Sequence, residues 1–298
     1  MPASTSTSTS NRNTIFLEDA RVISQTAFSD EQFILRVHAP KCAAHAKAGS
    51  FAHVTCDPLL PMRRPLSIMQ VDANEGWVDF LYKIVGEGLR LLASRVEGEV
   101  ISVLGPIGKP FKLNTSHRRP LLLGGGVGIP PMVFLADSLR TQSDFSPVLF
   151  MGSEVPFPFE LVASSLDLPG IDASVGQTIK LIEDWNIPAR LATLQGYAGC
   201  FNGYVTQAAA KWLDTLSTAE KAEVEIFACG PTPMLEACAK LAKEYDLPAQ
   251  VSLEEHMACA VGGCAGCTVL VETPTGSSMQ RVCVDGPVFN AYEVFPAA

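Results

Sequence analysis

Four cysteines near the end of the chain constrain its fold more than any other feature. They are Cys259, Cys264, Cys267 and Cys283, so three share one short loop and the fourth follows after a gap. A Cys-x4-Cys-x2-Cys run with a distant fourth Cys is the spacing of plant-type [2Fe–2S] centres. Three thiolates on a tight loop can surround two irons while the fourth arrives from another segment, so we predict one cluster bound by all four.

Zinc is the main alternative for these cysteines, followed by disulfides or free thiols. Structural zinc sites more often contain two short Cys pairs, whereas only Cys264 and Cys267 form such a pair here. The nine cysteines are an odd total, and five of them are scattered. The start of the chain has no secretory pattern, so we expect a reducing cytoplasmic location, where clustered cysteines bind metal rather than pair.

Charge and hydropathy argue against two classes of protein. The formal net charge is −9 and no basic patch is visible, so a nucleic-acid partner is not expected. The longest apolar runs, Pro120–Leu123 and Gly128–Ala136, are too short or too broken by Gly and Pro to span a membrane. Residues 1–14 are rich in Ser and Thr without hydrophobic periodicity, which predicts a disordered tail.

The rest of the chain divides into three parts. Residues 15–114 contain six short strand-like runs, which predicts an antiparallel β-barrel. Residues 115–248 alternate strand-like with helix-like runs, which predicts a parallel α/β sheet. Residues 249–298 are short and rich in Gly and Cys, so a metal centre must supply the constraint that a small core cannot. The predicted fold is therefore multidomain, a β-barrel followed by an α/β domain and a small cluster domain.

Two motifs in the barrel segment are typical of a flavin site. Arg64 to Ser67 ends a loop and opens a strand, where an Arg can contact a pyrophosphate through two hydrogen bonds. About twenty residues later, Lys83 to Gly88 ends a strand and starts a helix, and glycines there leave N–H groups for phosphate oxygens. Either motif alone also fits an ordinary surface loop, but both on neighbouring strands predict a flavin.

Two turns in the central segment predict a nucleotide site. The first follows a strand and precedes a helix, which is the context of a nucleotide-binding glycine turn. The second follows a later strand, so we expect it at the same carboxyl edge of the sheet. Their residues are Gly124, Gly125, Gly126 and Gly128 in the first turn and Cys229, Gly230 and Pro231 in the second. A close strand-to-helix crossing without a ligand is the alternative for the first turn.

Acidic residues and one cysteine refine these sites. No His–Cys arrangement is apparent, so we interpret Cys229 as a small polarisable side chain beside a nicotinamide rather than as a nucleophile. Glu154 follows a strand, where a carboxylate accepts hydrogen bonds from a ribose 2′-hydroxyl and repels a 2′-phosphate. It favours NAD over NADP, unless it is an ordinary exposed Glu. Glu254 and Glu255 precede the cysteine loop and, unless they are simply solvated, should lower the potential of a cluster there.

These motifs occur in the order found in the ferredoxin–NADP reductase superfamily, which the chain resembles. Its C-terminal part, with the run from Val282 to Phe289, is similar to the electron-transfer subunit of NAD-dependent dihydroorotate dehydrogenase, and the likeness covers about residues 15–295. The resemblance implies flavin contacts at Arg64, Pro65, Leu66, Ser67, Leu81, Tyr82, Lys83, Gly88 and Leu89. That family usually has Thr at the position of Leu89, so a backbone contact alone is expected there.

The resemblance also implies a redox chain. A partner subunit with its own FMN would oxidise dihydroorotate, and electrons would pass through [2Fe–2S] and FAD to NAD+ in UMP biosynthesis, within a heterotetramer of two copies of each subunit. FAD suits the middle position because it exchanges electrons singly or in pairs. A subunit of a sulfite reductase, hydrogenase or bifurcating reductase is the nearest alternative, and a non-catalytic zinc-binding interaction protein is an alternative of another class. No catalytic acid–base residue is expected.

Overall fold

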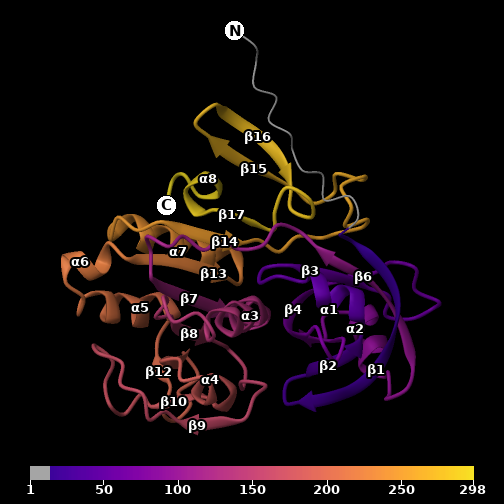
Figure 1. Cartoon of the computed structure of the whole chain (residues 1–298), viewed down its shortest axis with the longest axis horizontal. Helices are drawn as coiled ribbons and strands as arrows, with labels where there is room; N and C mark the ends of the chain where they lie inside the picture. Colours follow the sequence, from indigo (N-terminus) through magenta and orange to yellow (C-terminus); the bar gives the residue numbers. More distant parts are fainter. Residues whose placement is uncertain (1–13) are drawn as a thin grey trace.

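The computed structural model describes residues 14–298, so the predicted tail lies outside the described residues except for Thr14. The molecule contains a closed barrel, a seven-stranded sheet and a C-terminal segment that extends across the top of both in the view of Figure 1. Within residues 14–298, no helix has the length and apolar character needed to cross a lipid bilayer.

The N-terminal barrel confirms the predicted antiparallel architecture. Its strands are β1 (Phe16–Phe28), β2 (Gln32–His38), β3 (Phe51–Val54), β4 (Arg64–Asp72), β5 (Trp77–Lys83) and β6 (Val100–Ile107), and they close in the order β1-β2-β5-β4-β3-β6. Two short helices, α1 (Pro40–His45) and α2 (Glu87–Ala93), lie between strands. Asp30 and Glu31 have φ values of 58° and 57°, and two successive left-handed residues give the β1–β2 hairpin the twist that its strands favour.

The central sheet has the strand order β12-β11-β8-β7-β13-β14-β17. Its strands are β7 (Arg119–Gly125), β8 (Val148–Gly152), β11 (Ala189–Thr193), β12 (Phe201–Asn202), β13 (Val224–Cys229), β14 (Ala249–Ser252) and β17 (Val288–Asn290). Every neighbouring pair is parallel except β14–β17. The sheet predicted to be parallel is therefore mixed, because the C-terminal segment folds back and adds β17 as an antiparallel edge strand.

Helices and hairpins complete the fold. The remaining elements are η1 (Gly126–Gly128), α3 (Ile129–Leu139), β9 (Leu161–Ala163), β10 (Gln177–Ile179), α4 (Lys180–Asp184), α5 (Val205–Leu213), α6 (Thr218–Lys221), α7 (Thr232–Glu244), β15 (Thr268–Thr273), β16 (Gly276–Arg281) and α8 (Ala291–Val294). Helix α7 shows why these segments pack on the sheet. Its buried residues Leu235, Cys238, Ala239 and Ala242 recur at helical spacing and form one apolar face.

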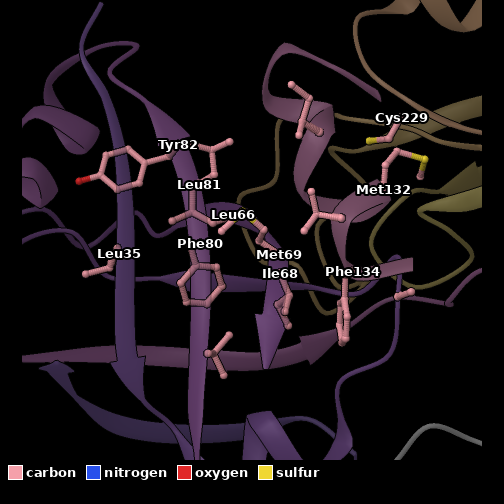
Figure 2. Close-up of a cluster of buried hydrophobic side chains, with 14 of the residues drawn as sticks. Leu35, Leu66, Ile68, Met69, Phe80, Leu81, Tyr82, Met132, Phe134 and Cys229 are labelled. Atoms are coloured by element: carbon pink, nitrogen blue, oxygen red, sulfur yellow. The ribbon is translucent and has the colours of Figure 1, made fainter. Parts of the chain in front are cut away.

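The barrel and the sheet share one hydrophobic core. It runs from Leu35 and Phe80 in the barrel to Met132 on α3 and Cys229 on β13 (Figure 2). Helix α3 packs against β4. This packing places the glycine turn at the start of α3 beside the strand that begins with Arg64.

Candidate cofactor sites

The cysteine loop is bent so that backbone N–H groups face sulfur. Ala260, Gly262 and Ala265 have φ values of 56°, 81° and 54°. Left-handed residues of this kind turn neighbouring N–H groups toward one side and form concavities that bind anions. The N–H of Cys264 donates to Cys259 Sγ at 3.4 Å. The loop therefore forms a cradle for negatively charged sulfur.

The four predicted ligands gather as two pairs. Cys259 lies against Cys264 on the loop, and Cys267 hydrogen bonds with Cys283, which follows β16. The second pair is buried, whereas Cys264 is exposed and Cys259 is half-buried. In residues 14–298, no three Cys, His, Asp or Glu side chains are assembled around the position of a single ion. Two thiolates for each of two irons is the donor set of a [2Fe–2S] centre, so these residues fit that group.

The two pairs differ in how readily they ionise. Burial raises the pKa of Cys259, but the N–H groups of Val261, Cys264 and Gly263 outweigh it and lower that pKa to about 7. Burial, together with the neighbouring Cys267, raises the pKa of Cys283 to about 12. Because the thiolate is the form that binds metal, the loop favours a charged ligand at Cys259, whereas Cys283 must lose its proton as iron binds.

The Asp-Gly-Pro run after Cys283 fastens this cluster segment internally. The carboxylate of Asp285 accepts hydrogen bonds from the backbone N–H of Arg281 at 2.9 Å and from its Nε at 3.1 Å. Arg281 Nη1 in turn donates to the carbonyl oxygen of Gly262 at 3.2 Å. Asp285 therefore positions an Arg that connects the fourth-ligand turn to the three-ligand loop.

The same run also attaches the cluster segment to the rest of the molecule. The N–H of Lys109, between the barrel and the sheet, donates to the carbonyl oxygen of Gly286, and the N–H of Leu253 donates to that of Pro287 at 2.9 Å. A Cβ on Gly286 would lie 2.2 Å from the ring of Phe289. Only glycine fits at position 286. The Asp-Gly-Pro run therefore forms the junction between the cluster segment and the rest of the molecule, besides following the predicted ligand Cys283.

The two flavin motifs meet as the sequence predicts. Strands β4 and β5 are hydrogen-bonded neighbours, and α2 follows β5. A Cβ on Gly88 would lie 2.9 Å from Nε of Arg64, so the guanidinium rests against the start of α2. Arg64 Nη1 donates to the carbonyl oxygen of Met62 at 2.8 Å. Gly86 has a φ of 89° and open space around its α-carbon, which leaves this turn accessible to a ligand.

Several residues implied as flavin contacts have buried side chains. Leu66, Leu81, Tyr82 and Leu89 are all buried, while Pro65, Ser67 and Lys83 are partly exposed. The hydroxyl of Tyr82 donates to Gln25 at 2.9 Å, and burial raises the pKa of Tyr82. Figure 2 shows Leu81 and Tyr82 among the core side chains of the barrel. The side chains at these four positions therefore belong to the hydrophobic core.

The two nucleotide turns also meet. Gly124 pairs in register with Cys229 across β7 and β13. A Cβ on Gly128 would lie 2.3 Å from the carbonyl oxygen of Cys229, and one on Gly125 would lie 2.3 Å from Sδ of Met234. Gly126 differs, because it has a φ of 54° and no atom near its missing Cβ. Close packing against the backbone therefore accounts for Gly128, Gly125 meets the flexible end of the Met234 side chain, and an open left-handed turn accounts for Gly126.

The sheet order puts these turns where ligands bind in α/β folds. The chain leaves β7 toward β8, β11 and β12 on one side and adds β13 and β14 on the other. The carboxyl ends of β7 and β13 thus flank the position where strand order reverses, which is the usual ligand crevice. Pro231 immediately precedes α7, and Glu154 is exposed beyond the end of β8 at the same edge.

Cys229 is unsuited to nucleophilic chemistry. Its side chain is fully buried, and burial raises its pKa well above the ordinary value. The thiol hydrogen bonds with Ser252, and the nearby Glu254 carboxylate disfavours a thiolate further. The interpretation of Cys229 as a small neutral side chain fits this environment.

Glu254 is a residue whose setting the sequence did not reveal. Besides preceding the cysteine loop, it lies within electrostatic reach of Cys229 and on the wall of a cavity of about 390 Å³. Gly230, Pro231 and Thr232 line the same cavity. The sequence did carry one signal for this position of Glu254. The residue comes just after β14, and the carboxyl ends of parallel strands meet at one edge of a sheet.

Comparison with known proteins agrees with this arrangement. Residues 254–295 match the iron–sulfur cluster binding domain of dihydroorotate dehydrogenase B. Among solved structures, an NADH-dependent reduced ferredoxin–NADP oxidoreductase has a TM-score of 0.75 at 24% identity, covering 93% of this chain and 90% of that one. The ferredoxin reductase of carbazole 1,9a-dioxygenase has a TM-score of 0.60 at 21% identity, covering 78% of this chain and 67% of that one. The fold is therefore that of the ferredoxin reductases.

Curated sequences define the family more narrowly. The dihydroorotate dehydrogenase B (NAD(+)) electron transfer subunit of Desulforamulus reducens is 30% identical over 93% of this chain and 97% of its own length. Its counterpart from Shouchella clausii is 31% identical over 92% of this chain and 96% of its own. The barrel, the α/β sheet and the cluster segment define an oxidoreductase component of the ferredoxin-reductase class with an iron–sulfur domain. Within that class, the chain belongs to the family of dihydroorotate dehydrogenase B electron transfer subunits.

Proposed function

We propose that this chain carries electrons from a dihydroorotate-oxidising FMN subunit to NAD+ through a [2Fe–2S] centre and FAD, in the synthesis of UMP. The observation that carries the proposal is the meeting of three motifs in one molecule. The glycine turn leads into α3, α3 packs on the strand that opens with Arg64, and the segment carrying the four cysteines contacts the barrel. A site for the cluster, a site for FAD and a site for NAD can therefore lie within one chain.

Each cofactor is assigned its own residues in this proposal. The cluster is held by Cys259, Cys264, Cys267 and Cys283. FAD contacts Arg64, Pro65, Leu66, Ser67, Leu81, Tyr82, Lys83, Gly88 and Leu89, through the backbone where the side chain is buried. NAD contacts Gly124, Gly125, Gly126, Gly128, Glu154, Cys229, Gly230 and Pro231, with Glu154 favouring NAD over its 2′-phosphorylated form.

The chemistry of the cofactors gives the order of transfer. A nicotinamide exchanges electrons in pairs as hydride, a [2Fe–2S] centre exchanges them singly, and FAD does both. The chain's own residues bind, orient and shield these groups. The buried, neutral Cys229 supplies a compact wall beside the nicotinamide and takes no proton, so we assign no catalytic acid or base.

The proposal includes an assembly and a division of the chain. The partner is an FMN-containing dihydroorotate dehydrogenase subunit, two copies of each forming a cytoplasmic heterotetramer. Residues 15–114 form the FAD domain, 115–248 the NAD domain and 249–298 the cluster domain. Strands β14 and β17 are shared, since they come from the third segment and complete the sheet of the second.

Visible spectroscopy on the anaerobic protein tests this function. The chain is purified alone and co-expressed with a candidate FMN subunit, then mixed with dihydroorotate and afterwards with NAD+. We expect bleaching of flavin and cluster in the co-expressed sample alone, followed by reoxidation by NAD+. A protein reduced by NADH but never by dihydroorotate would keep the reductase chemistry and reject this partner, leaving a subunit of another reductase complex. A colourless protein that contains zinc would reject the redox function.

A further inference from the structure

His53 occupies an unusual position between the flavin strand and the cysteine loop. It lies on β3, is 1% exposed, and pairs in register with Pro65 on β4. Its neighbours Ala52 and Val54 belong to the shared core. Because successive side chains of a strand point to opposite faces, His53 is turned toward the other side, where the C-terminal segment lies.

The imidazole ring connects these two regions directly. Its Nε2 lies 3.2 Å from the carbonyl oxygen of Met257, two residues before Cys259. A carbonyl oxygen can only accept, so Nε2 carries the hydrogen and Nδ1 is an acceptor. Within the described residues, that buried Nδ1 has no hydrogen-bond partner.

The backbone of His53 is held as well. Arg63 Nη1 donates to the carbonyl oxygen of His53 at 3.2 Å and to that of Ser102 on β6 at 3.0 Å. Burial lowers the pKa of His53, and the charges of Arg63 and Arg64 lower it further. A neutral ring is therefore fixed in place, with one nitrogen on the cysteine loop.

A half-satisfied buried imidazole costs stability relative to an apolar side chain of similar size. Packing alone does not account for it, whereas a directional contact with the loop does. Met257 is itself buried, so without His53 its carbonyl oxygen would lose this hydrogen-bond donor. The hydrogen bond ties the loop that carries three ligands to the strand next to the flavin motif.

We infer that His53 is a positioning residue that sets the distance and orientation of the cysteine loop relative to the flavin strand, and thereby the rate of electron transfer between the two cofactors. This inference rests on the proposed function. The rate of electron transfer falls exponentially as the separation of two cofactors grows, so a displacement of the loop after loss of this anchoring bond is expected to slow the transfer measurably.

Rapid mixing of NADH with the chain carrying FAD and the cluster separates two steps, reduction of the flavin and transfer of an electron from the flavin to the cluster. NADH gives two electrons to the flavin as hydride and becomes NAD+, and one of these electrons then moves to the oxidised cluster while the other stays on the flavin. Flavin absorbance follows the first step, and the EPR signal of the reduced cluster, sampled by freeze-quench, follows the second. Cluster and flavin contents are measured on every sample, and rates are expressed per loaded molecule.

Three variants give the test its controls. His53→Leu removes both nitrogens at similar size, and His53→Gln keeps an N–H donor within reach of Met257. Val54→Ala is the matched control, because Val54 is the next residue of β3, is fully buried and faces the opposite side. We expect His53→Leu to slow cluster reduction severalfold, with flavin reduction unchanged. His53→Gln should restore most of the rate, and Val54→Ala should leave it unchanged.

The outcomes separate the inference from the function beneath it. Equal flavin-to-cluster rates in wild type, His53→Leu and His53→Gln would overturn the role of His53 while leaving the redox function intact. A role in folding alone would lower cofactor content or melting temperature, as in Val54→Ala, without changing the rate per loaded molecule, and would also overturn it. If the wild-type chain showed no reduction of flavin or cluster by NADH, the proposed function itself would fail.

Discussion

In the cysteine loop every candidate ligand is a side chain, whereas four of the candidate flavin contacts, Leu66, Leu81, Tyr82 and Leu89, have side chains buried in the core. Cys259 and Cys264 sit in a loop whose N–H groups point at sulfur. By contrast, the side chains of Leu81 and Tyr82 are buried in the hydrophobic core that the barrel shares with the sheet. A site made by side chains depends on residue identity, while a site made by backbone depends on the shape of the strand. The two regions should therefore respond differently to substitution.

The largest effect is expected in the cysteine loop. Cys267→Ala removes one member of the buried ligand pair, and a cluster with three thiolates is not retained. Iron content and the EPR signal should be lost, and electron transfer to or from the partner should be lost with them. Flavin content and NADH-dependent flavin reduction should persist. Cys238→Ala, a buried cysteine on α7, is the control and should keep its cluster. Retention of iron in Cys267→Ala would mean that the four-cysteine assignment is incorrect.

Arg64 is the exception among the flavin contacts, because its side chain is proposed to act. Arg64→Ala should weaken flavin binding by about 1.5–3 kcal/mol, the usual contribution of a hydrogen bond to a charged group, which is roughly 10- to 100-fold in Kd. Titration of the flavin-free protein with FAD measures this directly. Arg90→Ala, on the exposed face of α2, serves as the comparison and should bind normally. Equal FAD affinities of Arg64→Ala and the wild-type protein would mean that Arg64 does not contact the pyrophosphate of FAD.

The glycine turn tests whether shape alone defines a site. In Gly128→Ala the new Cβ would lie 2.3 Å from the carbonyl oxygen of Cys229, so β13 and the turn must separate. Overpacking of this kind costs about 1–3 kcal/mol, and KM for NADH should rise with little change in flavin content. Gly176→Ala provides a match, since its Cβ would make only ordinary contact at 3.8 Å. Thermal unfolding and steady-state kinetics of both variants measure these effects. An unchanged KM for NADH in Gly128→Ala would mean that this turn is not part of the nucleotide site.

Tyr82 should show the smallest effect. Tyr82→Phe deletes the hydroxyl that donates to Gln25 and keeps the ring that stacks on Phe33. We expect a loss of about 1 kcal/mol in the free energy of unfolding and no change in FAD affinity. Denaturant unfolding and the same FAD titration measure both quantities. A marked loss of flavin would indicate that the hydroxyl, rather than the backbone, contacts the cofactor.

Local patterns were sufficient for much of this protein. The runs around Gln32–His38 and Trp77–Lys83 predicted barrel strands because alternation and turn residues are short-range signals. The cysteine spacing predicted a two-iron donor set for a similar reason, since three of the ligands lie on one loop. Residues 157–210 gave no motif, and the structure places β9, β10, α4, β11, β12 and the start of α5 in that region. Their short strands and interrupted helices carry too little periodicity to be recognised.

The sequence by itself determined the barrel and the alternating α/β segment, and it predicted the four cluster ligands, because each depends on residues close together in the chain. The tertiary structure alone decided that β17 joins the central sheet, that Glu254 lines one cavity with Gly230 and Pro231, and that His53 contacts the cysteine loop. These contacts join residues far apart in sequence. They follow from how three units pack against one another, and packing of this kind depends on the complementary shape of whole surfaces rather than on any local pattern.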